Sequence, residues 1–314
     1  MKALVVGDAG FIGSHLCDAL LAEGHSVICV DNFSLGTGEN IRHLMDHERF
    51  VCYQTDASKE EELSRNFQTQ RPEYVFHLAA NSDIQASAED PEVEYRNTYS
   101  TTFQILYCMR RFGVKKLFFA STSAVYGDQR DVELDENTSR LAPISYYGAA
   151  KLGSEALISA FSYMNDMQVL VFRFPNVIGP RLTHGVIYDF MQKLQKGPGH
   201  LRILGNGRQS KPYLHVTDLV DVIMQFKETA GLGVTLYNVG AEEETSVNKI
   251  ADIVCRELGL ENVQYEYTGG EGGWKGDVPR FQYCLDKIHK ADWRARYTSD
   301  EAVRRTLQEN QGRI

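Results

Sequence analysis

Up to residue 173 the chain alternates short apolar runs with longer segments in which apolar residues recur every three or four positions. Apolar runs bounded by glycine or polar turns predict buried strands, and the longer periodic segments predict helices. Strands that alternate with helices are typical of an α/β fold with a parallel sheet. We expect strands at 3–6, 26–30, 49–54, 74–78, 116–120 and 168–173, and helices at 11–23, 60–70, 93–112 and 147–164.

Beyond residue 173 the pattern loosens, because glycines and prolines punctuate residues 174–207. We interpret this stretch as the start of a smaller, substrate-facing domain. A helix at 216–229 and a strand at 235–239 are expected to return to the first domain, and helices at 247–258 and 299–309 belong to the C-terminal part. The predicted division is a first domain of residues 1–174, with 216–240 returning to it, and a second domain of 175–215 and 241–314.

Three glycines, Gly7, Gly10 and Gly13, stand between the first predicted strand and the first predicted helix. In that context one glycine permits a tight turn, one lets the backbone approach a pyrophosphate, and one lets the helix pack on the strand. The free N–H groups of the helix N-terminus then face the phosphates. The turn therefore predicts dinucleotide binding, and the alternative is a purely structural turn.

An acidic residue ends the second predicted strand at Asp31. A carboxylate there can accept hydrogen bonds from the adenosine ribose and repels a 2′-phosphate, which favours NAD over NADP. The alternative for Asp31 is a strand-end turn residue. Asp56 follows the third strand, where it either approaches the adenine amine or is an ordinary loop aspartate.

Tyr147 and Lys151 are four residues apart, so they share one face of a helix. A lysine ammonium beside a phenol favours the phenolate, because an opposite charge stabilises the ionised form. The pair would supply a base next to NAD+, which is a hydride acceptor. A base and a hydride acceptor together can oxidise an alcohol. By itself the spacing is weak, and the alternative is two residues on a solvated helix face.

Bulk composition excludes several classes of protein. The 314 residues suffice for one large domain or two joined domains, and a net charge of -9 argues against a nucleic-acid partner. No apolar run approaches the length of a membrane span, and Gly7 and Asp8 interrupt the N-terminal apolar stretch too early for a signal peptide. The six cysteines are scattered without a Cys-x-x-Cys pair, so we expect no metal site, no disulfide framework and a reducing, cytoplasmic location.

At this point the chain resembles the extended short-chain dehydrogenase/reductase family, in its nucleotide-sugar epimerase/dehydratase branch. Within that branch it is most similar to the UDP-glucose (UDP-galactose) 4-epimerases. The resemblance covers nearly the whole length. It rests on the motifs Gly7-Asp-Ala-Gly-Phe-Ile-Gly13, Asp31-Asn32, His77-Leu-Ala-Ala80, Ser121-Thr-Ser-Ala-Val-Tyr-Gly127, Tyr147-Gly-Ala-Ala-Lys151, Arg173-Phe-Pro-Asn-Val-Ile-Gly-Pro-Arg181, Tyr213-Leu-His-Val-Thr-Asp218 and Gly276-Asp277.

The resemblance implies a Rossmann-type doubly wound parallel sheet that binds NAD and a smaller C-terminal α/β domain that binds a nucleotide sugar. Carried over by position, it implies a catalytic set of Tyr147 (base), Lys151, Thr122 and Asn97. The implied cofactor-binding residues are Gly7, Gly10, Phe11, Ile12, Gly13, Asp31, Asn32, Asp56, Ala57, Leu78, Ala79, Ala80, Tyr147, Lys151 and Pro175. The implied substrate-binding residues are Asn81, Thr122, Ser123, Asn176, Arg181, Val186, Ile187, Lys211, Tyr213 and Asp277.

The residues after Thr122 bear on the reaction. The related 4,6-dehydratases place an Asp-Glu pair there, whereas this chain has Ser123 and Ala124, which cannot do carboxylate acid–base work. The resemblance therefore implies interconversion of UDP-glucose and UDP-galactose through a transient 4-keto sugar, a reaction of carbohydrate metabolism. The alternatives are epimerisation of another nucleoside-diphosphate hexose, NAD-dependent oxidation of a sugar nucleotide, and a non-catalytic NAD-binding module.

Three positions depart from the usual pattern of these relatives. Asp8 stands where glycine is usual, and Lys211 stands where an arginine often binds the diphosphate. Trp274 stands where many relatives have a second such arginine. A lysine keeps the charge but loses the two-pronged geometry of arginine. The family also implies a homodimer formed by helices 93–112 and 147–164. Its candidate apolar face is Ile105, Leu106, Met109, Phe161 and Met164, and the alternative is that these residues pack only on the sheet.

Overall fold

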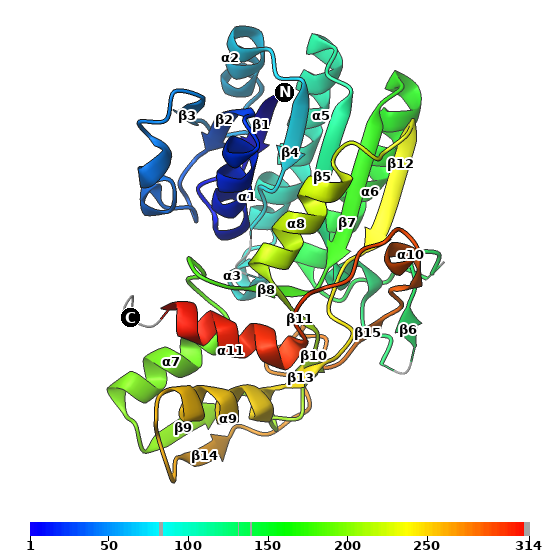
Figure 1. The fold of residues 1–314 in the computed structure, drawn as a ribbon. Coiled ribbons are helices and arrows are strands. Elements are labelled where there is room, and N and C mark those ends of the chain that lie inside the picture. Colours follow the sequence, from blue (N-terminus) through cyan, green and yellow to red (C-terminus); the bar gives the residue numbers. More distant parts are fainter. Residues whose placement is uncertain (82–83, 131, 139, 311–314) are drawn as a thin grey trace. The chain divides into compact units, whose positions relative to one another are not determined.

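The structure is a computed structural model that describes residues 1–81, 84–130, 132–138 and 140–310 (Figure 1). The chain divides into two compact units. The first unit comprises Met1–Val125, Ser145–Arg173 and Val220–Tyr237, and the second comprises Tyr126–Ile144, Phe174–Leu219 and Asn238–Ile314. Each unit is described below by itself.

A seven-stranded sheet forms the centre of the first unit, in the order β12-β7-β5-β4-β1-β2-β3. The neighbouring strands from β5 to β3 pair in parallel, as the alternating pattern predicts. The ends of each strand lie within two residues of the predicted ends. The prediction succeeds because a strand buried on both faces consists of a continuous run of apolar residues. The strands are β1 (Lys2–Val6), β2 (Ser26–Asp31), β3 (Phe50–Gln54), β4 (Tyr74–His77), β5 (Lys116–Thr122), β7 (Gln168–Phe174) and β12 (Gly233–Asn238).

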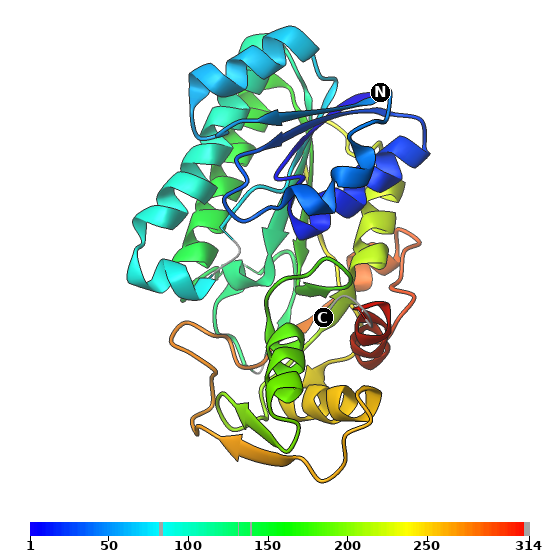
Figure 2. The ribbon, with the colours of Figure 1, turned by 90° about the vertical axis from the view of Figure 1, so that its left-hand side faces the viewer.

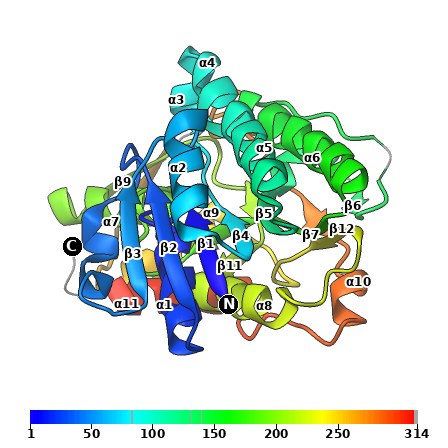
Figure 3. The ribbon, with the colours of Figure 1, turned by 90° about the horizontal axis from the view of Figure 1, so that it is seen from above.

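Helices cover both faces of this sheet, which confirms the doubly wound α/β fold. Figure 3 shows α2 (Glu60–Gln70), α5 (Thr101–Phe112) and α6 (Tyr146–Asn165) on one face, and α1 (Phe11–Ala22) with α8 (Val216–Phe226) on the other. The larger core lies under the first group, where Leu4, Val6 and Ile28 of the sheet pack against α5 and α6.

The helix predicted at 93–112 is interrupted. Its residues form α4 (Glu92–Glu94), a π-helical turn η3 (Tyr95–Ser100) and then α5. On α5, the predicted dimer residues Ile105, Leu106 and Met109 are fully buried in the core, so the alternative that they pack on the sheet is correct for these three. Periodicity predicted an apolar face here but could not say whether sheet or partner covers it.

The second unit has a core of its own, formed by α7 (Val186–Lys196), α9 (Val247–Glu257) and α11 (Ser299–Asn310). Figure 2 shows α7 in light green beside α9 in gold. The strands β9 (His200–Ile203) and β14 (Gln264–Tyr267) pair in parallel, as do β8 (Asn176–Ile178) and β11 (Tyr213–His215). Helix α7 was not predicted, because the glycines and prolines around it obscured its periodicity.

Residues 126–144 pack with the second unit, whereas the predicted division placed them in the first domain. The Tyr126 hydroxyl donates to Asn238 Oδ1 at 2.7 Å, and Asn238 Nδ2 donates to the Leu134 carbonyl at 2.8 Å. Strand β6 (Glu133–Leu134) also pairs with β15 (Gln282–Tyr283). These contacts join segments more than 100 residues apart, which local patterning does not encode.

The remaining elements are short. They are η1 (Gly38–Asn40), η2 (Arg42–Leu44), α3 (Ile84–Glu89), η4 (Ser123–Tyr126), β10 (Ser210–Lys211), β13 (Thr245–Ser246) and α10 (Asp286–His289). Among the described residues, no helix combines the length and the apolar character needed to cross a membrane.

Candidate active site

The glycine-rich turn joins β1 to α1 and leaves no room for a Cβ atom at Gly7 or Gly13. Gly7 has φ of +87°, and a Cβ added there would lie 2.6 Å from Ala79 N. A Cβ on Gly13 would lie 2.3 Å from the Gly7 carbonyl oxygen, and Gly10 caps α1 without a side-chain hydrogen bond. The backbone N–H groups at the start of α1 are therefore open to a phosphate, which fits the pyrophosphate of NAD. The remaining predicted residues here are the half-buried Phe11 and Ile12 on α1 and Leu78, Ala79 and Ala80 after β4.

The predicted ribose and adenine residues follow β2 and β3. Asp31 is buried, and its two carboxylate oxygens accept hydrogen bonds from the backbone N–H groups of Ala9 at 3.0 Å and Phe33 at 2.7 Å. Asp31 thus fixes the glycine-rich turn, and the ribose would take its remaining lone pairs. Asn32 is exposed, Ala57 is buried, and Asp56 is half-buried and accepts a 3.0 Å hydrogen bond from Ser58 N.

Three predicted catalytic side chains lie together where β5 ends and α6 begins. Ser145 caps α6 by accepting a 3.1 Å hydrogen bond from Gly148 N, which places Tyr147 in the first helical turn. The Tyr147 phenol makes a hydrogen bond with Thr122 at the end of β5. Lys151, one turn further, is buried; its Nζ lies 5.9 Å from the centre of the Tyr147 ring and donates to the Ala120 carbonyl at 2.8 Å.

Burial controls the ionisation of this group. It raises the pKa of the Tyr147 phenol, the Glu94 carboxylate raises it further, and the hydrogen bond with Thr122 lowers it. Burial also lowers the pKa of the Lys151 ammonium to about 8, although the carboxylates of Glu94 and Glu155 oppose this. The expected lowering of the tyrosine pKa is therefore not a property of the protein groups alone, since burial and Glu94 together outweigh the hydrogen bond with Thr122.

A buried acid, Glu94, belongs to this group and was not predicted. Its side chain is 2% exposed and accepts 2.8 Å hydrogen bonds from Asn81 Nδ2 and Thr98 Oγ1. Asn81, a predicted substrate residue, is thereby held beside Glu94, and Asn97 lies half-buried in the π-helical turn η3. Single π turns in helices occur frequently at functional sites. The sequence offered no signal for Glu94, because nothing in its spacing separates it from the exposed acids around it.

Predicted substrate residues of the second unit form two pairs. Tyr213 of β11 is in register with Asn176 of β8 and hydrogen-bonds it; burial raises the pKa of Tyr213 to about 12. Lys211 Nζ lies 2.5 Å from Asp277 Oδ1, and Asp277 Oδ2 accepts a 3.0 Å hydrogen bond from Gly273 N. The Lys211 ammonium is therefore already paired, so it is a weaker anion site than a free arginine.

The other predicted residues of the second unit differ in exposure. Ile187 is 2% exposed and packs into the core of α7, α9 and α11, so its side chain serves packing. Val186 packs at the edge of the same core and is half-buried. Arg181 is half-buried with φ of +71°, and Pro175 is buried. Ser123, in the 3-10 turn η4 after β5, is half-buried.

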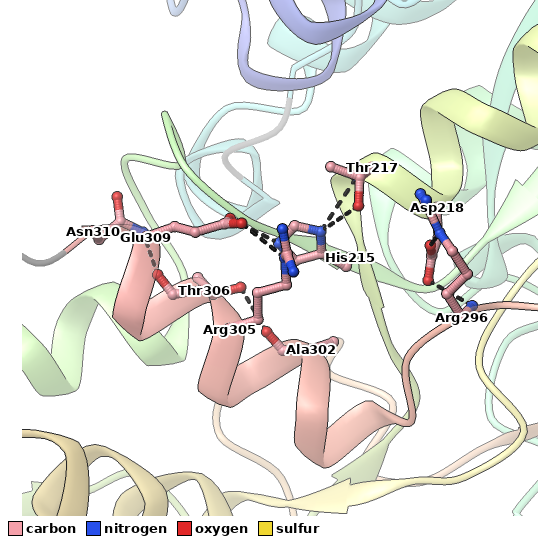
Figure 4. A network of polar contacts seen from close by, with 9 residues as sticks. All are labelled: His215, Thr217, Asp218, Arg296, Ala302, Arg305, Thr306, Glu309 and Asn310. Atoms are coloured by element: carbon pink, nitrogen blue, oxygen red, sulfur yellow. Dashed lines mark hydrogen bonds and ion pairs between the residues drawn. The ribbon is translucent and has the colours of Figure 1, made fainter.

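The His215 side chain contacts Glu309 of helix α11, as Figure 4 shows. Its ring is fully buried, with Nδ1 2.7 Å from Thr217 Oγ1 and Nε2 3.1 Å from Glu309 Oε2 on α11. Nearby, Asp218 accepts hydrogen bonds from Arg296 N at 3.0 Å and Arg296 Nε at 2.9 Å. Burial lowers the pKa of His215, and Glu309 raises it. These contacts give His215 a structural role between β11 and α11.

The fold and these sites define an NAD-binding enzyme of the short-chain dehydrogenase/reductase class. Residues 3–240 match the NAD dependent epimerase/dehydratase family, and the chain belongs to that family. NAD is its cofactor, and the turn described above fits that group. No cluster of three or more His, Cys, Asp or Glu side chains suited to a metal occurs in the described part of the chain.

Individual relatives point to the same branch. The UDP-glucose 4-epimerase of Mycolicibacterium smegmatis is 31% identical over 264 residues, which is 82% of this chain and 83% of the relative. A crystal structure of a UDP-galactose 4-epimerase matches with a TM-score of 0.88 at 34% identity and covers 100% of both chains. The UDP-glucose 4-epimerase of Thermus thermophilus, in complex with NAD, matches with a TM-score of 0.88 at 30% identity and covers 100% of both chains.

Proposed function

We propose that this protein is an NAD-dependent nucleotide-sugar 4-epimerase that interconverts UDP-glucose and UDP-galactose. One observation carries the proposal: Tyr147, Thr122 and Lys151 meet at the end of β5, where Ser123 and Ala124 supply no acid–base pair for elimination. The names of its relatives supply the substrate, because the two solved structures and the mycobacterial protein are UDP-glucose or UDP-galactose 4-epimerases.

In the proposed reaction, Tyr147 takes the proton of the sugar C4 hydroxyl and Thr122 holds the hydroxyl oxygen. Lys151 stays fixed by the Ala120 carbonyl and keeps a positive charge near the phenol. When bound, NAD+ would supply a reversible acceptor for the hydride of the sugar C4–H bond, so that no net NADH would form. Because burial raises the pKa of Tyr147, its ionisation needs further positive charge close by.

The diagnostic experiment is an NMR assay of the purified protein with NAD and UDP-, GDP-, CDP- and dTDP-hexoses, in which the anomeric signals are followed. We expect UDP-glucose and UDP-galactose to interconvert without net NADH. Conversion of a different sugar nucleotide would correct the substrate, and stoichiometric NADH would make the protein a dehydrogenase.

The neighbouring tyrosines provide a matched pair of variants. Tyr147→Phe removes the proposed base, and we expect a loss of at least about 100-fold in kcat. Tyr146→Phe makes the same chemical change at an exposed side chain and should leave the rate unchanged. Equal rates for the two variants would refute the role of Tyr147.

We also propose that the protein is a homodimer formed through the outer faces of α5 and α6. Large apolar side chains remain exposed there: Phe103 and Tyr107 on α5, and Tyr163 and Met164 on α6, the last two at 85% and 76%. Contiguous exposed apolar surface marks an interaction site. Sedimentation of the parent protein and of a Tyr163→Glu variant tests this. We expect the parent protein to sediment as a dimer and the variant as a monomer, and a monomeric parent protein would contradict the proposal.

We propose a reducing, cytoplasmic location as well, which the six free cysteines support.

A further inference from the structure

Asp8 is a fully buried carboxyl group inside the glycine-rich turn. Its side chain is 0% exposed, and neither carboxylate oxygen accepts a hydrogen bond of good geometry within the described residues, although the Cys29 thiol and the backbone N–H groups of Asp8 and Val30 lie near enough to lower its pKa. Buried carboxylates in proteins are normally paired with a cation or accept several N–H groups, because a bare buried charge is strongly unfavourable. A group in this position relieves the penalty by taking up a proton.

The titratable groups that face Asp8 come from the adjoining strand β2, and none of them is a cation. Asp31 adds a second carboxylate, which disfavours charge on Asp8. The Cys29 thiol, whose Sγ lies 2.9 Å from Cys52 Sγ on β3, lowers the Asp8 pKa, as do the backbone N–H groups of Asp8 and Val30. Burial prevails over these contributions and raises the pKa of Asp8 to about 7.

Asp8 also belongs to the turn that fits the pyrophosphate of NAD. The turn is tightly closed, since a Cβ on Gly13 would lie 2.4 Å from Asp8 Cα. The N-cap position of α1, Gly10, lies two residues after Asp8 and offers no side-chain cap to the helix N–H groups. A negative charge on Asp8 would oppose the negative pyrophosphate in this small, poorly solvated turn, and a neutral carboxylic acid would not.

We propose that Asp8 links NAD binding to a proton: the protein binds the dinucleotide with Asp8 in its neutral form and takes up a proton where Asp8 would otherwise be charged. The inference rests on NAD as the cofactor and is independent of which sugar is the substrate. Asp8 acts here as a positioning residue of the cofactor site and takes no part in the chemistry.

The test is a calorimetric titration of nucleotide-depleted protein with NAD+ at pH 6 and pH 8, each in two buffers that differ in ionisation enthalpy. With a free-protein pKa of about 7, binding should take up about 0.1 proton at pH 6 and about 0.9 proton at pH 8. The affinity for NAD+ should fall about tenfold over the same range.

Two variants locate the effect. Asp8→Asn keeps the shape of the side chain and removes the titration, so proton uptake and the pH dependence of affinity should both vanish. Asp46→Asn makes the same change at an exposed position of the same unit and should behave like the parent protein.

Absence of proton uptake in the parent protein at pH 8 would overturn the proposal without any variant. Undiminished uptake in the Asp8→Asn variant would also overturn it, by assigning the proton to another group. Sugar epimerisation is not measured, so failure here and failure of the proposed function are distinguishable.

Discussion

Replacing Asp8 by asparagine should change how the stability of the protein depends on pH. The unfolded chain has the ordinary aspartate pKa of 3.8, whereas burial raises the folded-state pKa to about 7. Between these values the folded protein binds more protons than the unfolded chain. Its free energy of unfolding therefore falls as the pH rises from about 4 to 7, and above that the destabilisation by Asp8 is complete and no longer changes with pH. The Asp8→Asn variant lacks this contribution.

The magnitude follows from the two pKa values. One pKa unit corresponds to about 1.4 kcal/mol, so charging Asp8 in the folded state costs up to about 4 kcal/mol at high pH. The variant should gain about 3 kcal/mol relative to the parent protein between pH 5 and pH 8. The Asp8→Asn variant also buries an unpaired amide, which costs about 1–3 kcal/mol. That cost is the same at pH 5 and at pH 8, so it does not affect the difference between the two pH values.

Urea unfolding without added nucleotide, followed by circular dichroism at pH 5, 6, 7 and 8, measures this change. Both tryptophans, Trp274 and Trp293, belong to the second unit, so their fluorescence would not report on Asp8. The exposed Asp46→Asn substitution is the control and should stay within about 0.5 kcal/mol of the parent protein. Parallel curves for Asp8→Asn and the parent protein across the pH range would refute the argument.

Two further variants test the active site and the turn. Glu94 raises the pKa of Tyr147, so Glu94→Gln should lower that pKa and move the acidic limb of the kcat/KM profile to lower pH; an unmoved limb would contradict the assignment. Gly13→Ala would drive a Cβ into backbone atoms and should weaken NAD binding at least about 100-fold by calorimetry, whereas Gly38→Ala, with open space around it, should bind as the parent does.

The sequence predicted those features that are written locally. Continuous apolar runs located the central strands to within two residues, and the spacing of Gly7, Gly10 and Gly13 located the tight turn that fits the pyrophosphate of NAD. The interval between Tyr147 and Lys151 placed both on one helix face, where the structure finds them. These features can be predicted from the sequence because apolar strand runs, helix periodicity and turn residues each depend on residues that are close together in the chain.

Features that depend on packing were decided only by the tertiary structure. Ile105 formed part of a predicted dimer face and lies in the core, and residues 126–144 pack with the second unit through hydrogen bonds to Asn238. Glu94, the last residue of α4, lies beside Asn81 and near the proposed base Tyr147 only because of the tertiary structure. The sequence singled out Asp8 as unusual, but its burial, which is the main cause of its raised pKa, is set by the fold. Burial and proximity arise between residues far apart in the chain, and the pKa of a group is set by both.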